Sequence, residues 1–138
     1  MNPAKFQNVH PVLPVTNIAA AIRFYTDHLG FRTLFQDPAD IDLEDPTPRH
    51  PSYAVIERDN VRLHLQSHNT DNPEDRTEPL HLRFLIDDVD SLYTEYQSRG
   101  AINLERFTGK VLADTPWGTR EFGLYDPDRN GLFFYRSL

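Results

Sequence analysis

The 138-residue sequence contains no cysteine. This absence excludes disulfide bonds, thiolate metal sites and cysteine nucleophiles, and it fits a reducing compartment. The sequence also lacks an apolar run of the roughly 20 residues that a membrane-spanning helix requires. Residues 1–7 contain no apolar segment of signal-peptide length. We therefore expect a cytoplasmic protein that does not bind membranes.

Positive charge is scarce as well. Lys and Arg number 14 against 21 Asp and Glu, which gives a net charge of -7. No basic stripe is present, so we expect no nucleic-acid partner. An acidic chain suits neutral or cationic ligands, although much surface charge serves only solubility. The sequence has no glycine-rich phosphate loop and no serine in a nucleophile-elbow context, which excludes phosphoryl transfer and serine hydrolase chemistry.

The most informative feature that is present is an internal repeat. Residues 10–18 are echoed by residues 81–89, and each copy is followed by an amphipathic stretch that stops at a glycine, Gly30 and then Gly100. We predict one domain over residues 1–138, made of two modules at about 6–68 and 80–136. A generic α+β domain with two chance matches is the alternative interpretation.

Each module has the pattern of a βαβββ unit. Thr16 and Asn17 can cap a first helix, whose apolar stripe runs from Ile18 to Leu29. A second helix begins at Val89 with the same spacing of apolar residues. Residues 36–52 are rich in Asp and Pro and predict a long loop, and residues 67–79 predict the connector between modules. The predicted strands are 6–13, 31–35, 53–57, 61–66, 80–86, 101–107, 119–125 and 132–136.

Side chains on strands alternate between two faces, so the face away from the helices can be listed. If each sheet is strongly curved, these residues would gather around a cavity with the helices outside. The fold class that we predict is therefore α+β, with two tandem modules around a shared cavity. Aromatic rings with a few polar groups are typical of a small-molecule pocket, while a solvent-exposed face is the alternative. The predicted set is His10, Arg62, His64, Gln66, His81, Arg83, Glu121, Tyr125, Phe133 and Tyr135.

Several segments resemble a known family. Residues 12–18 with 24–31, then 63–65, 116–122 and 126–131, are similar to the vicinal-oxygen-chelate superfamily, which includes glyoxalase I, extradiol dioxygenases and bleomycin-resistance proteins. The resemblance covers Val12 to Tyr135. The segment from Trp117 to Glu121, ahead of the Asp126-Pro127 turn, is closest to the bleomycin-resistance branch. That branch implies a homodimer whose interface crevices bind a bulky cationic antibiotic without chemical turnover.

The resemblance also suggests which residues contact the ligand. Trp117 would be either a ligand-stacking wall or a plug between the two modules, and both interpretations stay open. The expected partner is a small organic molecule. The predicted ligand-binding residues are Arg62, Gln66, Arg83, Trp117, Glu121, Tyr125, Phe133 and Tyr135.

Metalloenzymes of this superfamily hold one divalent ion with four side chains, two from each module. Carried over by position, these are His10, His64, His81 and Phe133, and a phenyl ring cannot bind a metal. Three imidazoles still suffice for Zn, Ni or Fe. We therefore expect a binding protein with no cofactor. The alternatives are a metal-dependent lyase, isomerase or dioxygenase that uses the three histidines, and a partner-binding module with no small ligand.

Overall fold

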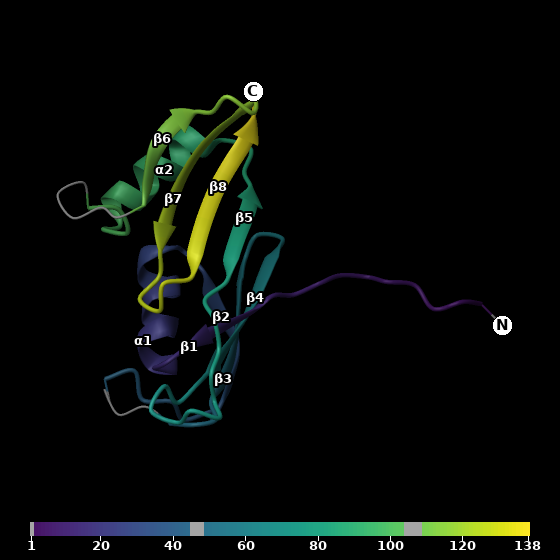
Figure 1. The fold of residues 1–138 in the computed structure, drawn as a ribbon, viewed down its shortest axis with the longest axis vertical. Helices are drawn as coiled ribbons and strands as arrows, with labels where there is room; N and C mark the ends of the chain where they lie inside the picture. The colour runs from purple at the N-terminus through teal and green to yellow at the C-terminus, as the bar shows by residue number, and fades with distance from the viewer. Residues whose placement is uncertain (1, 45–48, 104–108) are drawn as a thin grey trace.

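The computed structural model describes residues 2–44, 49–103 and 109–138, and it places two modules one beyond the other along the long axis (Figure 1). Each module holds one four-stranded sheet, and the strand orders are β1-β4-β3-β2 and β5-β8-β7-β6. In both sheets the first and last strands of the module pair in parallel, which confirms the internal repeat and the α+β class. The strands are β1 (Val12–Val15), β2 (Arg32–Asp37), β3 (Tyr53–Arg58), β4 (Val61–Ser67), β5 (His81–Leu85), β6 (Lys110–Asp114), β7 (Thr119–Tyr125) and β8 (Gly131–Ser137).

Among the described residues, each module has one α-helix, capped as its sequence predicts. The Asn17 side chain accepts a hydrogen bond from the Ala20 N–H at 3.0 Å, and Asp88 accepts one from the Ser91 N–H at 3.0 Å. Gly30 and Gly100 have φ of 78° and 77°, the left-handed conformation that ends a helix. None of the described helices combines the length and hydropathy needed to cross a membrane. The helical segments are α1 (Ile18–Arg23), which continues as the π-helical turn η1 (Phe24–His28), and α2 (Val89–Ser98).

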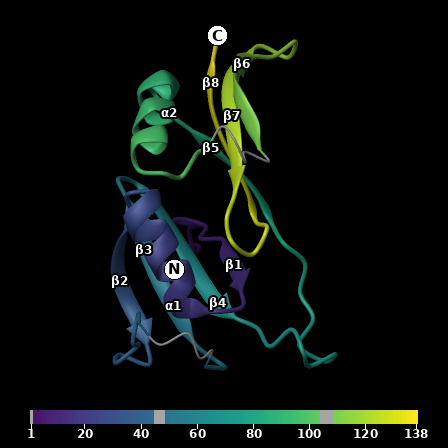
Figure 2. The same cartoon turned by 90° about the vertical axis from the view of Figure 1, so that its left-hand side faces the viewer.

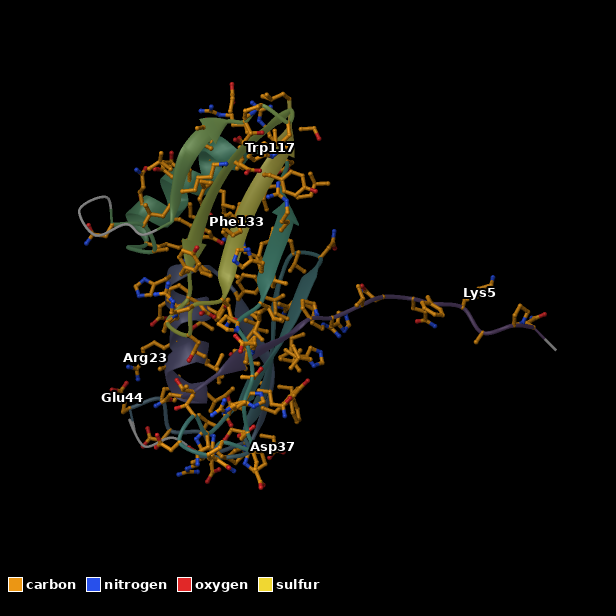
Figure 3. All side chains as sticks on the ribbon, in the orientation of Figure 1. Lys5, Arg23, Asp37, Glu44, Trp117 and Phe133 are labelled. Carbon is orange, nitrogen blue, oxygen red and sulfur yellow. The ribbon has the colours of Figure 1, made fainter. Side chains whose placement is uncertain are left out.

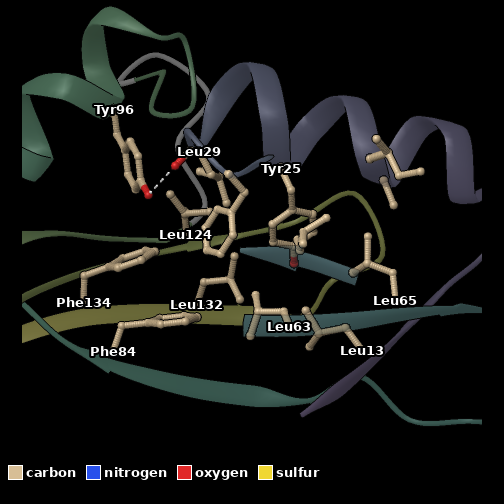
Figure 4. Close-up of a cluster of buried hydrophobic side chains, with 14 of the residues drawn as sticks. Leu13, Tyr25, Leu29, Leu63, Leu65, Phe84, Tyr96, Leu124, Leu132 and Phe134 are labelled. Atoms are coloured by element: carbon tan, nitrogen blue, oxygen red, sulfur yellow. Dashed lines mark hydrogen bonds between the residues drawn. The ribbon is translucent and has the colours of Figure 1, made fainter. Parts of the chain in front are cut away.

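One face of each sheet packs on a helix. In the first module α1 contacts β3 and β4, and in the second α2 contacts β7 and β8 (Figure 2). Alternate strand residues such as Leu63 and Leu65, or Leu132 and Phe134, are buried on that side, as the period of two predicts (Figure 4). The residues between them therefore lie on the opposite face of each sheet, away from the helices.

A single core joins the modules, and hydrogen bonds between them reinforce it. The Tyr96 hydroxyl donates to the Leu29 carbonyl at 3.0 Å, which Figure 4 shows as a dashed line. Arg58 on β3 donates to both carboxylate oxygens of Glu95 on α2, at 2.7 and 2.9 Å. Because these partners come from both halves of the chain, neither module has a complete core of its own.

Two predicted strands differ from the structure. Residues 2–9 form an extended, exposed arm that leaves the body (Figure 1), and β1 begins at Val12. Pro11 has no N–H to donate, so the ladder with β4 cannot continue through it. The strand predicted at 101–107 is wrong at 101–103, which lie outside any strand, and its remaining residues fall outside the described part of the chain. The corresponding strand is β6, which begins at Lys110.

Candidate functional site

The face of the second sheet that is turned away from α2 carries most of the predicted ligand-binding residues. Figure 3 shows Phe133 on β8 and Trp117 near the C-terminal end of the module. Strand pairing sets Arg83 beside Phe133 and Glu121 beside Tyr135. We call this face, together with Lys110 and Trp117 at its edge, the module-two platform; it comprises His81, Arg83, Lys110, Trp117, Glu121, Tyr125, Phe133 and Tyr135.

The floor of the platform is the ring of Phe133, which lies flat on glycine backbone. A Cβ added to Gly123 would come within 2.5 Å of that ring, and one added to Gly131 within 3.1 Å. His81 lies at its side, with ring centroids 5.2 Å apart. The two glycines therefore let a large aromatic ring settle onto the sheet, where it is half-buried.

A charged cluster adjoins this floor. Arg83 on β5 crosses β8, where its guanidinium lies 4.6 Å from the Tyr135 ring centroid, and donates to Glu121 on β7 at 2.6 Å. Lys110 on β6 donates to the other Glu121 oxygen at 2.8 Å, and Thr119 donates to Glu121 at 3.0 Å. Side chains from three strands, β5, β6 and β7, thus converge on one carboxylate.

Glu121 is an ionised group in a nearly closed environment, with 2 % of its surface exposed. Burial raises the pKa of its carboxyl, but the hydrogen bonds from Arg83, Lys110 and Thr119 outweigh that effect and lower the pKa to about 2. The carboxylate therefore keeps its charge at neutral pH and fixes the two cations over the platform.

Trp117 forms an exposed edge of the platform. Its surface is 64 % exposed, so it does not plug the junction between modules. The Lys110 ammonium lies 4.9 Å from its ring centroid. Gly118 follows it with φ of 86° and no atom within 4 Å of an added Cβ, so backbone conformation and not close approach requires glycine there.

The remaining predicted residues lie on the face of the first sheet that is turned away from α1. We call the face of either sheet that is turned away from its helix the outer face. The rings of His10 and His64 stack with centroids 5.4 Å apart, and the Tyr53 hydroxyl lies 2.6 Å from His64 Nδ1. Arg62 donates to Glu57 at 2.8 Å, and Gln66 lies one alternation beyond His64 on β4. The structure therefore brings together two of the three predicted metal-binding histidines in one module, while His81 belongs to the other.

Sequence reasoning did not anticipate the cavity of about 450 Å³ at the junction of the modules. None of the eleven predicted site residues lines it. Its walls come from the β3–β4 turn, the end of β5 and the first turns of α2, and they combine aromatic rings such as Phe31 and Tyr96 with the acids Asp59, Asp87 and Glu95. Lys110 was missed for a related reason, because its strand was predicted too early in the chain. Neither the cavity nor the contact of Lys110 with Glu121 follows from a local sequence pattern, since both depend on how distant segments of the chain meet.

The protein consists of two βαβββ modules, and in each of them the first and last strands pair in parallel. The modules share one core, and aromatic rings lie on the outer face of the second sheet. This architecture defines a class of proteins that are built from two such modules and bind ligands. The sequence matches the Glyoxalase/Bleomycin resistance protein/Dioxygenase superfamily over residues 7–134, and the chain belongs to that family. A bleomycin resistance protein of Geobacillus stearothermophilus is 25% identical over 142 residues, which is 93% of this chain and 95% of the relative. A bleomycin resistance protein of Staphylococcus aureus gives the same values.

Solved structures agree on the fold. The bleomycin resistance determinant encoded on transposon Tn5 superposes with a TM-score of 0.71 at 19% identity, covering 96% of this chain and 98% of the other. An antibiotic binding protein from Streptomyces sp. CB03234 gives 0.68 at 22% identity, covering 99% and 100%. The bleomycin-binding protein of Streptomyces verticillus, solved with copper(II)-bleomycin, gives 0.65 at 25% identity, covering 96% and 97%. The predicted family and fold are thereby confirmed.

Proposed function

We propose that this protein binds a small organic molecule on the module-two platform and sequesters it without chemical turnover. The observation that carries the proposal is the flat ring of Phe133 on Gly123, with Trp117 exposed at the platform edge. Exposed aromatic surfaces held rigidly by the backbone suit the stacking of a planar ligand. The relatives named as bleomycin resistance and bleomycin-binding proteins support the same class of function.

A binding titration tests this function. Trp117 is the one tryptophan of the chain, so its fluorescence reports on the platform directly. Bleomycin, with and without copper(II), and neutral planar aromatic amides are titrated by calorimetry and fluorescence. Phe133→Ala should weaken binding about tenfold because it removes the stacking surface. Phe35→Ala is the matched control, since Phe35 is an exposed aromatic on the first sheet. The proposal fails if no ligand binds, or if both variants bind like the parent protein.

The proposal includes a homodimer in the cytoplasm. Phe6 is 104% and Val9 83% exposed on the extended arm, so two apolar side chains stand in water next to the body. Large apolar side chains on an extended arm are available for contact with a second chain. A second copy of the chain is the partner that the family resemblance implies, and the absence of cysteine fits a reducing compartment.

One observation favours a second candidate, a metal-dependent lyase, isomerase or dioxygenase. Burial, followed by the charges of His10 and Arg62, lowers the pKa of His64 and favours the neutral imidazole that binds metals. Across residues 2–44, 49–103 and 109–138, however, no group of three or more donors is close enough to hold an ion. His10 and His64 lie together in the first module, and His81 lies on β5 of the second.

Elemental analysis of the purified protein decides between the two candidates. The binding proposal expects metal well below one ion per chain. A stoichiometric metal that is lost in His64→Ala and in His81→Ala would replace it with the metal-dependent candidate. His28→Ala is the control, because His28 bonds to the Arg99 carbonyl and lies away from both outer faces.

A further inference from the structure

The charge of the module-two platform is opposite to that of the whole chain. The net charge of the protein is -7, yet two cations, Arg83 and Lys110, surround a single carboxylate on the described part of this face. Further along the same face, the guanidinium of Arg129 lies 5.6 Å from the centroid of the Tyr125 ring. A ligand that settles on Phe133 therefore meets a local excess of positive charge.

The one carboxylate of this cluster is not available to a ligand. Glu121 is 2 % exposed, and both of its oxygens already accept hydrogen bonds. One oxygen takes the Lys110 ammonium, and the other takes Arg83 and Thr119. A cationic ligand would have to displace these donors before it could pair with Glu121, and it would first meet two like charges.

The two cations, in contrast, are accessible. The side chain of Arg83 is 47% exposed and that of Lys110 is 35% exposed. A guanidinium carries five N–H groups and an ammonium three, and each of these side chains uses one in its bond to Glu121. Both also lie against platform rings, Tyr135 and Trp117, which hold their heads beside the aromatic floor.

We propose that the module-two platform selects planar aromatic ligands that carry a carboxylate or another acidic group, with Arg83 and Lys110 receiving the acid and Phe133 receiving the ring. This inference rests on the proposed binding function, and it adds the charge class of the ligand. Arginine pairs with carboxylates through two parallel hydrogen bonds, which neutral amides and ammonium groups cannot reproduce. The acidic net charge of the chain, which by itself suits cationic ligands, does not act at this surface.

Three ligands with one ring system test the charge class without any mutation. Naphthalene-2-carboxylate, naphthalene-2-carboxamide and naphthalen-2-ylmethylammonium share one ring system, and each carries a single substituent that is anionic, neutral or cationic. Calorimetry at low and high salt should show the carboxylate binding about tenfold more tightly than the amide, because a charge-assisted bond replaces a neutral one. Added salt should weaken the carboxylate more than the amide. The ammonium ligand should bind most weakly.

Variants then locate the preference. Arg83→Gln and Lys110→Gln, made separately, should each reduce the advantage of the carboxylate and leave the affinity for the amide within about twofold. Arg32→Gln is the matched control, since Arg32 also pairs with a carboxylate, that of Glu57, but lies on the first sheet. Two separate substitutions are used because each leaves Glu121 with a remaining cation, which preserves the fold.

The outcomes separate this inference from the proposed function. Equal affinities for all three ligands, or a preference for the ammonium, overturn the charge class; the binding function survives if Phe133→Ala still weakens binding. Binding of none of the three ligands overturns the charge class, and the binding function then survives only if bleomycin or another planar amide binds in the titration described above. An unchanged carboxylate preference in both Arg83→Gln and Lys110→Gln also overturns the inference, because the acid would then be received elsewhere.

Discussion

The hydroxyl of Tyr25, on the first helix, donates a hydrogen bond of 2.8 Å to the carboxylate of Asp126, on the turn before the last strand. Burial and the Asp126 charge raise the pKa of Tyr25, so its hydroxyl stays protonated and keeps donating. Asp126 also accepts from Asn130, whose amide donates to the Pro14 carbonyl at 3.0 Å. A polar contact inside the core thus ties β1 and the first helix to the second module.

Tyr25→Phe should therefore lower the free energy of unfolding by about 1–3 kcal/mol, because it leaves a buried carboxylate oxygen with one donor fewer. Urea denaturation followed by circular dichroism measures the change. Tyr93→Phe is the control, since the Tyr93 hydroxyl has no hydrogen-bond partner among the described residues; it should shift the free energy by less than about 0.5 kcal/mol. Equal losses in the two variants would contradict a special role for the contact.

Gly123→Ala should destabilise the protein by about 1–3 kcal/mol, because the new Cβ would lie 2.5 Å from the Phe133 ring. The same substitution made in a Phe133→Ala background should cost much less, since the clashing ring is gone. Urea titration of the four proteins gives the coupling energy between the two positions. Additive effects would mean that Gly123 is needed for another reason.

The stability of the protein should fall as the pH drops from about 4.5 toward 2, partly through Glu121. Its pKa is about 2 in the folded state against 4.5 for an unperturbed glutamate, so the unfolded chain binds the proton first. Glu121→Gln should remove this part of the pH dependence. Glu44→Gln, at an exposed carboxylate, should keep the profile of the parent protein. Unfolding curves at several pH values measure it, and parallel profiles for all three proteins would contradict the prediction.

Deletion of residues 2–9 should convert the proposed dimer to a monomer while leaving the body folded. The arm carries the exposed Phe6 and Val9, so its loss removes intermolecular contacts in preference to internal ones. Sedimentation measures the mass, and circular dichroism checks the fold. Phe6→Ser should weaken the dimer, and Gln7→Ser is the neighbouring control. A truncated chain that remains a dimer would exclude the arm, and a monomeric parent protein would exclude the dimer.

The sequence predicted the faces of the strands well because alternation is a local rule. Leu63 and Leu65 on β4 are buried against the helix of the first module, as expected. In the second sheet, the Phe133 and Tyr135 side chains lie on the outer face, also as expected. Helix ends were also predictable, because Asn17 and Gly30 act through their immediate neighbours. These features depend on a few adjacent residues, so one chain without relatives suffices to find them.

Long-range features could not be predicted in the same way. The strand predicted from Phe6 has the right residue types, yet strand pairing with β4 begins only at Val12, and the one backbone bond before it is from the His64 N–H to the Pro11 carbonyl. Alternation gives the face on which each side chain lies, but the gathering of both faces around one cavity was an added prediction about how the sheets curve; in the structure His81 lies beside Phe133 and His10 lies beside His64. The cavity at the junction depends on the docking of the β3–β4 turn against α2, which no local pattern encodes.

The shared core has a consequence for the origin of the fold. The Tyr96 hydroxyl donates a hydrogen bond to the Leu29 carbonyl, and the Arg58 guanidinium donates one to Glu95, so each half of the chain completes the interior of the other. In an ancestor of half this length, the apolar surfaces that now form the shared core would have been exposed to water. Such a chain could have persisted only by associating with an identical copy. Gene duplication would then have replaced a concentration-dependent encounter with a covalent tether.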